Sequence, residues 1–439
     1  GECPIGLVGN TYGIITTSFN EVPVSLEFIR SQVETLYYFA LLRPDLTFLV
    51  TKIGTGIAGF SIDEIKDKNK WVKFVADHNL GGVQLCLQRE AAHLADRGLD
   101  HLNLFPAAFS PAVLAPGQTG LVGVLLNSEL VGYFDPATVT SVLADIAGGE
   151  RSFAIHSMLG HAPDAVLDLI AAAGLKAGFF WVHDFASLCT GYTLLRNDVA
   201  HCGAPPPDSA ACGICIHGQH RMTQIRAHDQ LFQTLDLTVV APSQAALDTW
   251  KSGWTYRHVG EIVHPNASLV ERKPPRRVAA GPSRPFRFAF VGMPAGHKGW
   301  PLFREVVIRY AGDPRYQFLH LGNRTEPGLS LEFHRVSVTP DRPLAMLETL
   351  ESLQVDAAMV WSICNETFSL TAYEAIAAGA AIITGTDSGN VAALAGAGGH
   401  GLVLTEGELP PHDRIRFRGE ELDPPSPLVI VLKIGRAHV

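Results

Sequence analysis

The sequence predicts an α/β protein that contains two α/β units joined by a linker. Short apolar runs that are typical of buried strands alternate with helix-like segments over residues 71–270. A Pro- and Arg-rich stretch without periodicity, residues 271–285, interrupts the pattern and is interpreted as the linker. The alternation starts again over residues 286–405. This pattern favours parallel sheets whose strands are connected by helical crossovers.

The composition is that of an ordinary globular protein. Its 439 residues are 47% hydrophobic and 18% charged, which excludes disordered, collagen-like and small disulfide-framework chains. A net charge of −9 argues against a nucleic-acid-binding protein. No apolar run approaches the length of a membrane-spanning helix, and no signal peptide is apparent. We therefore expect a cytoplasmic protein with reduced cysteines, for which peripheral contact with the inner face of the membrane stays open.

Residues 1–70 are interpreted as an extra α/β segment that arose by fusion or as a chimera. They contain a helix-like stretch, SLEFIRSQVETLYYFALL, and a strand-like run, LTFLVTKIG. Through GNTYG and FLVTKIG the segment weakly resembles a small uncharacterised bacterial α/β module. That resemblance implies no function.

A glycine pattern follows the strand-like run of this segment. Gly54, Gly56 and Gly59 have the spacing G-x-G-x-x-G, and Asp77 lies 18 residues beyond Gly59. The pattern resembles a dinucleotide-binding fingerprint, in which the glycines admit a pyrophosphate and the acid binds the ribose. A tight glycine-rich turn is the alternative, because only 11 residues separate Gly59 from Trp71, where the next strand-like run begins.

The first α/β unit is expected to begin with a strand, WVKFVAD, and a helix that ends at Gly98. Gly81 and Gly82 lie in the turn between them, where backbone N–H groups at a helix start can face a phosphate. A simple connecting turn is the alternative. The further strand-like runs of this unit are HLNLFP, FAIHSM, GFFWVHD and LTVVAPS.

The second α/β unit carries a lysine and two glutamates near strand ends. Lys298 follows the strand-like run FRFAFVG, and Glu366 and Glu374 lie eight residues apart around a helix predicted to begin near Thr371. Free backbone N–H groups over residues 368–371 and the positive helix end can hold a phosphate. The alternatives are a solvated surface lysine and acids that pair with the helix dipole. The later strand-like runs are YQFLHLG, DAAMVWS and AAIITGT.

Taken together, these motifs resemble a known enzyme family. HKG after a strand, then E-x7-E, a small-residue helix and AIIT, is similar to the donor half of family 4 glycosyltransferases of the GT-B fold. ADHNLGGVQ, IHSMLGH and VHDFASLC are similar to the acceptor half of its bacterial polysaccharide enzymes. The resemblance covers residues 71–405 and implies two Rossmann-like domains that face each other across a cleft. It also implies metal-independent, retaining transfer from a nucleotide-diphosphate sugar to a glycan or lipid-linked glycan, in cell-surface polysaccharide synthesis.

The resemblance implies a role for each candidate residue. His183 would lie near the donor sugar, Lys298 would hold the diphosphate, and Glu366 would hold the sugar, so these three are the predicted catalytic residues. Glu374 would bind the ribose. The predicted donor-binding residues are Gly81, Gly82, Lys298, Glu366, Phe368, Ser369, Leu370 and Glu374.

Two features depart from the family pattern. Met293 stands where the family often has an arginine, five residues before the lysine, so the diphosphate has one cation fewer. Residues 406–439 show no amphipathic run that could form the closing helix, and they are interpreted as a truncated or artefactual tail. One codon choice for the last seven residues, KIGRAHV, spells a common sequencing-library adapter, and a natural tail is the alternative.

Four cysteines form the pattern C-x12-C-x9-C-x2-C at Cys189, Cys202, Cys212 and Cys215. Four thiolates can hold a structural zinc ion tetrahedrally, and the C-x2-C half has a suitable spacing. A loop with unpaired thiols and no metal is the alternative. The interspersed histidines are His201, His217 and His220.

The leading hypothesis from the sequence is therefore a glycosyltransferase that needs no catalytic cofactor. An NAD-type oxidoreductase that uses the Gly54–Gly59 loop is one alternative, and an inactive truncated fusion is another. The expected partners are a nucleotide sugar and a glycan or lipid-linked acceptor. The sequence leaves open the sugar, the base, the acceptor and the oligomeric state.

Overall fold

The computed structural model divides into two compact units, residues 1–109 with 121–133 and residues 110–120 with 134–439. Several predicted features lie outside the described residues: the Gly54–Gly59 loop, Asp77, Gly81, most of the linker and the tail. The domain boundaries predicted from the sequence stay predictions. The structure describes residues 6–8, 11–13, 82–107, 112–118, 120–145, 151–269, 284–339, 342–397 and 399–404.

The first unit contains a short hairpin, one helix and a three-stranded sheet. Its helix and first sheet strand coincide with the predicted helix before Gly98 and the predicted strand HLNLFP. That strand pairs antiparallel with its neighbour, so the parallel arrangement expected for it is wrong. The next connection, between the second and third strands of this sheet, has only two residues, Asn127 and Ser128, which adopt φ of 51° and 70° as is typical of a hairpin. The elements are β1 (Gly6–Val8), β2 (Thr11–Gly13), α4 (Gly82–Ala95), β3 (Leu102–Pro106), β4 (Val122–Leu126) and β5 (Glu129–Phe134).

The second unit contains two parallel sheets. In the first, the strand order is β11-β10-β7-β6 and every pair is parallel. Alternate residues of its strands, such as Phe180 and Val239, pack with Phe232 and Trp250 of the covering helices in one core. The strands are β6 (Ala154–Ile155), β7 (Ala177–Trp181), β10 (Asp236–Ala241) and β11 (Gly260–Val263). The helices of this part are α5 (Pro136–Asp145), α6 (Pro163–Ala172), α8 (Gly218–Thr234) and α9 (Gln244–Gly253).

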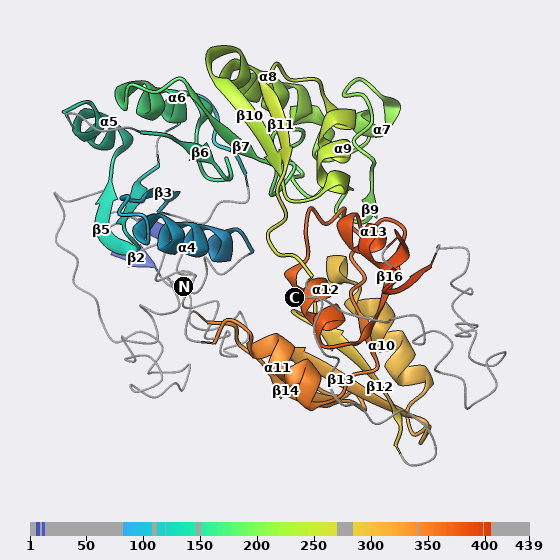
Figure 1. Ribbon diagram of the computed structural model, residues 1–439. Helices are drawn as coiled ribbons and strands as arrows, with labels where there is room; N and C mark the ends of the chain where they lie inside the picture. Colours follow the sequence, from blue (N-terminus) through green and yellow to red (C-terminus); the bar gives the residue numbers. More distant parts are fainter. Residues whose placement is uncertain are drawn as a thin grey trace. The chain divides into compact units, whose positions relative to one another are not determined.

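The second sheet has six parallel strands in the order β14-β13-β12-β15-β16-β17 (Figure 1). Its strands are β12 (Phe286–Val291), β13 (Tyr316–Gly322), β14 (Glu332–Arg335), β15 (Ala357–Met359), β16 (Ala381–Gly385) and β17 (Gly401–Leu404). The main helices are α10 (Trp300–Arg309), α11 (Ala345–Ser352), α12 (Leu370–Ala377) and α13 (Asn390–Ala397). The predicted strand runs FRFAFVG, YQFLHLG, DAAMVWS and AAIITGT are therefore confirmed.

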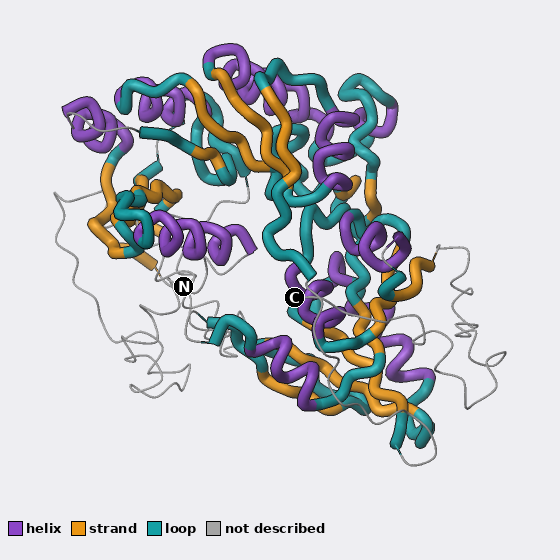
Figure 2. The backbone as a smooth tube through the Cα atoms, viewed as in Figure 1, coloured by secondary structure: helices purple, strands orange, loops and turns teal. Residues whose placement is uncertain are grey.

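Both faces of this sheet are covered by helices (Figure 2). Phe288 and Phe290 pack against α10, whereas the alternate residues Ala289 and Val291 join the core formed with α11 and α12. This alternation follows from the two-residue period of a strand that is buried on both faces. The predicted α/β class with two Rossmann-like sheets is thus confirmed. Within the described residues, no helix is long and apolar enough to cross a membrane.

Candidate functional site

Lys298 and Glu366 meet at the carboxyl edge of the six-stranded sheet. Lys298 ends the short 3-10 helix η1 (Gly296–Lys298) after β12, and Glu366 lies in the loop between β15 and α12. β12 and β15 are hydrogen-bonded neighbours from which the chain continues in opposite directions along the sheet. Open α/β sheets bind ligands at such a switch point. Here the two side chains form an ion pair between Nζ and Oε1.

Hydrogen bonds join the loop after β12, which carries Lys298 (the lysine loop), to the loop between β15 and α12, which carries Glu366 (the glutamate loop). The carbonyl of His297 accepts a hydrogen bond from the Ser362 hydroxyl at 3.2 Å and another from the N–H of Ile363 at 3.0 Å. Ser362 follows β15 directly after a buried tryptophan, so it belongs to the strand-end loop that continues to Glu366. These hydrogen bonds therefore keep the loops that carry Lys298 and Glu366 together at the edge of the sheet.

The ion pair keeps the lysine charged while leaving it accessible. Burial lowers the pKa of Lys298, but the charge and hydrogen bond of Glu366, together with Cys364 and Tyr192, raise it by more, so the net pKa lies above its usual range. The pKa of neighbouring His297 is lowered by burial and by the Lys298 charge, which favours a neutral ring. The Lys298 side chain is 41% exposed and that of Glu366 is 19% exposed. An incoming anion can thus reach the ammonium group.

A glycine presses against the backbone of the glutamate loop. Gly389 has φ of 60°, and a Cβ atom there would lie 2.5 Å from Asn365 Oδ1 and 2.6 Å from the Glu366 carbonyl oxygen. The following N–H, of Asn390, donates to that carbonyl at 2.9 Å. This position therefore admits only glycine, and its close approach fixes where Glu366 stands.

The start of α12 follows the glutamate loop and adds backbone N–H groups to the site. Ser369 caps the helix, because its hydroxyl accepts a hydrogen bond from the N–H of Ala372 at 3.3 Å. Phe368 is buried and stacks on Tyr373, with ring centroids 4.5 Å apart. Leu370 begins the helix, where backbone N–H groups have no acceptor inside the helix and the dipole is positive. The predicted anion-binding segment thus follows Glu366 directly in the chain.

Glu374 lies on α12, half-buried, within the second turn of the helix. If Glu374 binds the ribose, as the resemblance implies, Glu374→Ala should weaken the binding of a nucleotide-diphosphate sugar by about 1–3 kcal/mol, because ribose hydroxyls would lose their acceptor. Isothermal titration with the sugar nucleotide measures this change. Glu305→Ala, at an exposed position of α10, is the control and should bind like the unaltered chain. An unchanged dissociation constant for Glu374→Ala would remove this residue from the site.

Two hydrogen bonds link the glutamate loop to the other parallel sheet. The hydroxyl of Thr367 donates to the carbonyl of His183, just after β7, at 2.9 Å. The hydroxyl of Ser243, which caps α9, donates to the carbonyl of Thr367 at 2.7 Å. The structure thereby brings His183 to the loop that carries Glu366. The sequence analysis missed both hydroxyl residues, since a contact 124 residues apart leaves no local pattern.

His183 also belongs to a group of rings at the ends of β6 and β7. Its Nε2 lies 3.1 Å from Nδ1 of His156, so the two imidazoles share a hydrogen bond. Trp181 stacks on His183 with ring centroids 4.9 Å apart. His156 was not singled out from the sequence, although its place in IHSM, at the end of a strand that pairs with β7, is the signal that could have found it.

The remaining predicted residues lie elsewhere. Gly82 is the first residue of α4, in the first compact unit, and Gly81 lies outside the described residues. Their contact with a donor phosphate stays a prediction. Met293, which replaces the arginine of the family pattern, is 44% exposed after β12. The four cysteines of the predicted zinc site all line one cavity.

Comparison with family models and with curated protein sequences finds no match. Among solved structures, the chain is similar to the pneumococcal O-GlcNAc transferase GtfA in complex with UDP and GlcNAc, with 15% identity, a TM-score of 0.41 and coverage of 72% of this chain and 57% of that one. It is similar to Anabaena HepE in complex with UDP-glucose, with 14% identity, a TM-score of 0.38 and coverage of 62% and 68%. A third is WaaG, a glycosyltransferase involved in lipopolysaccharide biosynthesis, with 10% identity, a TM-score of 0.38 and coverage of 68% and 89%. The match thus spans little more than half of GtfA.

Proposed function

We propose that this chain is a retaining glycosyltransferase that moves a sugar from a nucleotide-diphosphate sugar to a glycan or lipid-linked glycan. One observation carries the proposal: a lysine–glutamate pair stands at the switch point of a parallel sheet, beside the capped start of a helix. A cation and backbone N–H groups at one sheet edge are suited to a diphosphate. A role in cell-surface polysaccharide synthesis, in the cytoplasm, belongs to the same proposal.

The chemistry requires negative charge to be stabilised on the leaving diphosphate. When the bond between the anomeric carbon and the phosphate oxygen breaks, Lys298 and the N–H groups at the start of α12 face the oxygen that gains charge. Such fixed donors lower the barrier because they need no reorganisation during the reaction. Glu366 holds the lysine before the donor arrives and can accept hydrogen bonds from sugar hydroxyls. These groups supply the positive charge without a catalytic metal.

In this proposal the four-stranded parallel sheet contributes the residues that meet the sugar. His183 is held by Thr367, so a shift of the glutamate loop moves both groups together. The imidazole of His156 constrains the ring of His183. The proposal assigns the acceptor side of the reaction to the ends of β6 and β7 and the leaving group to the ends of β12 and β15.

A screen against nucleotide sugars tests the proposal. The full chain is mixed with a panel that varies the base and the sugar, and thermal shift and release of nucleoside diphosphate are measured. At least one donor should raise the midpoint of unfolding and be hydrolysed slowly without acceptor. The anomeric proton of the transferred sugar, observed by NMR, should show retained configuration. A panel without any binder would contradict the proposal.

Substitutions of Thr367 test whether its hydrogen bond positions His183 for turnover without contributing to nucleotide binding. Thr367→Val removes the hydroxyl that donates to His183 and keeps the shape of the side chain, so kcat should fall about tenfold, the equivalent of one hydrogen bond of about 1–1.5 kcal/mol. The dissociation constant of the nucleoside diphosphate should stay nearly unchanged. Thr367→Ser retains the hydroxyl and should restore turnover. If the valine variant turns over normally, or the serine variant is equally impaired, the hydrogen bond has no role in positioning.

A further inference from the structure

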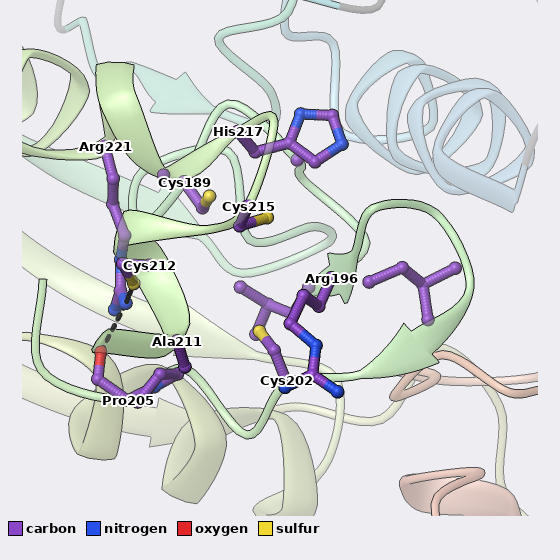
Figure 3. A pocket seen from close by; sticks show the side chains of 13 residues that line it. Cys189, Arg196, Cys202, Pro205, Ala211, Cys212, Cys215, His217 and Arg221 are labelled. Atoms are coloured by element: carbon purple, nitrogen blue, oxygen red, sulfur yellow. Dashed lines mark hydrogen bonds between the residues drawn. The ribbon is translucent and has the colours of Figure 1, made fainter. Parts of the chain in front are cut away.

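One small cavity is separate from the site described above. It lies in the segment between β7 and α8, and its volume is about 20 Å³. That is room for a single water molecule or ion and far too small for a sugar or a nucleotide. Figure 3 shows its lining, which includes all four cysteines of this segment: Cys189, Cys202, Cys212 and Cys215.

The four cysteines come from four places in the fold. Cys189 follows β7, Cys202 follows the two-residue strand β9 (Ala200–His201), Cys212 lies in the four-residue helix α7 (Ala210–Gly213), and Cys215 precedes α8. The segment from Cys189 to Cys215 contains only two-residue strands and a four-residue helix, so few backbone hydrogen bonds of regular structure stabilise it. All four cysteines line one ion-sized cavity, and four thiolates are the donor set of a structural zinc site.

A buried arginine that lines the cavity, Arg221, would favour a negatively charged group inside it. Arg221 is 1% exposed, and its guanidinium donates to the carbonyls of Leu188 and Gly253 and to Cys212 Sγ, the last at 3.2 Å. Among the described residues it has no carboxylate partner. A buried cation without an anion is costly. Zinc bound by four thiolates carries a net charge of −2 and would supply that anion.

The residues next to the cysteines are packed tightly or are bonded to other groups. A Cβ atom at Gly218 would lie 1.8 Å from the Cys212 carbonyl oxygen, so only glycine fits beside the C-x2-C pair. His217 also lines the cavity, but its Nε2 is bonded to Asp198 at 2.9 Å and is thereby engaged elsewhere. Within the described residues, no three His, Cys, Asp or Glu side chains already stand in a metal-binding arrangement. Zinc binding would therefore require the sulfurs to close on the ion, to the Zn–S distance of about 2.3 Å that such sites have.

We propose that Cys189, Cys202, Cys212 and Cys215 bind one structural Zn²⁺, with Arg221 balancing the charge of the thiolates. The ion ties the segment that follows β7 to the start of α8. The proposal is independent of the glycosyltransferase function, because no residue of this cavity belongs to the Lys298–Glu366 site.

Metal analysis of the full chain, purified without added metal, tests the proposal. Elemental mass spectrometry should find about one zinc per chain, and a thiol-blocking mercurial should release it to a chromogenic chelator. Chain that is stripped and reloaded with Co²⁺ should show a thiolate-to-cobalt charge-transfer band. Cys202→Ser and Cys215→Ser should lose the zinc, whereas Cys364→Ser, a buried cysteine of the other sheet, should keep it.

The cobalt spectrum decides the matter even where a serine variant fails to fold, because it is recorded on the unaltered chain. A folded chain with far less than one zinc, and no charge-transfer band after addition of Co²⁺, would overturn the proposal. Zinc that persists in both serine variants, or that is lost from Cys364→Ser alone, would also overturn it, because the metal would then be held elsewhere.

Discussion

The substitution Lys298→Ala is expected to lower kcat/KM by about 10²–10³, which corresponds to roughly 3–4 kcal/mol of transition-state stabilisation. The lysine is the cation at the switch point of the six-stranded sheet, and Glu366 keeps it protonated by raising its pKa. Without it, the leaving diphosphate retains only the N–H groups at the start of α12. The loss should appear both in transfer to an acceptor and in slow hydrolysis of the donor.

Lys251, on the surface of helix α9, offers a matched control. Lys251 pairs with Glu261 at 2.9 Å, and its side chain is 49% exposed. Lys251→Ala removes the same charge from the chain, so it corrects for effects of net charge on stability and solubility. This variant should retain full activity. Equal losses in the two variants, or normal turnover in Lys298→Ala, would exclude Lys298 from the reaction.

Asp356→Ala should be the most destabilising single substitution that we predict, at about 3–5 kcal/mol in the free energy of unfolding. Its carboxylate, 11% exposed, accepts two hydrogen bonds from the Arg284 guanidinium at 2.7 Å each. A third comes from the N–H of Arg287 at 2.8 Å, at the start of β12. Removal of the carboxylate takes this two-bonded ion pair from the buried Arg284 guanidinium and the side-chain acceptor from the N–H of Arg287.

Urea unfolding followed by tryptophan fluorescence measures this effect. Glu348→Ala is the control, because its ion pair with Arg342 is exposed, with side chains 60% and 65% accessible. Such surface pairs contribute about 0–1 kcal/mol. If both substitutions cost the same small amount, the Arg284–Asp356 pair is not a structural element of the sheet.

The sequence was informative where a pattern is local. Strand runs such as FRFAFVG and AAIITGT are continuous and apolar, because strands of a parallel sheet are buried on both faces, and each was found in place. Lys298 and Glu366 could be singled out for the same reason, since both follow such runs. The rule that carboxyl ends of parallel strands share one edge predicts that these two side chains can meet.

Other features depend on contacts that no local pattern encodes. The antiparallel pairing of β3 with β4 joins two strands that lie far apart in the chain without a short turn between them, so no local motif marks it. The link from Ser243 through Thr367 to His183 joins segments that are distant in sequence. Ser and Thr at helix starts are commonly read as caps alone, so their second contacts appear only when the sheets are placed together.

Titration of a nucleotide-diphosphate sugar into three proteins, in the presence of a metal chelator, tests the central claim most directly. The unaltered chain and Lys251→Ala should bind at least one sugar nucleotide with equal affinity. Lys298→Ala should bind the same compound at least about tenfold more weakly, because the diphosphate would lose the cation that Lys298 supplies at the β12–β15 switch point. Equal affinity in all three proteins, or no binding of any sugar nucleotide to the unaltered chain, would contradict the account.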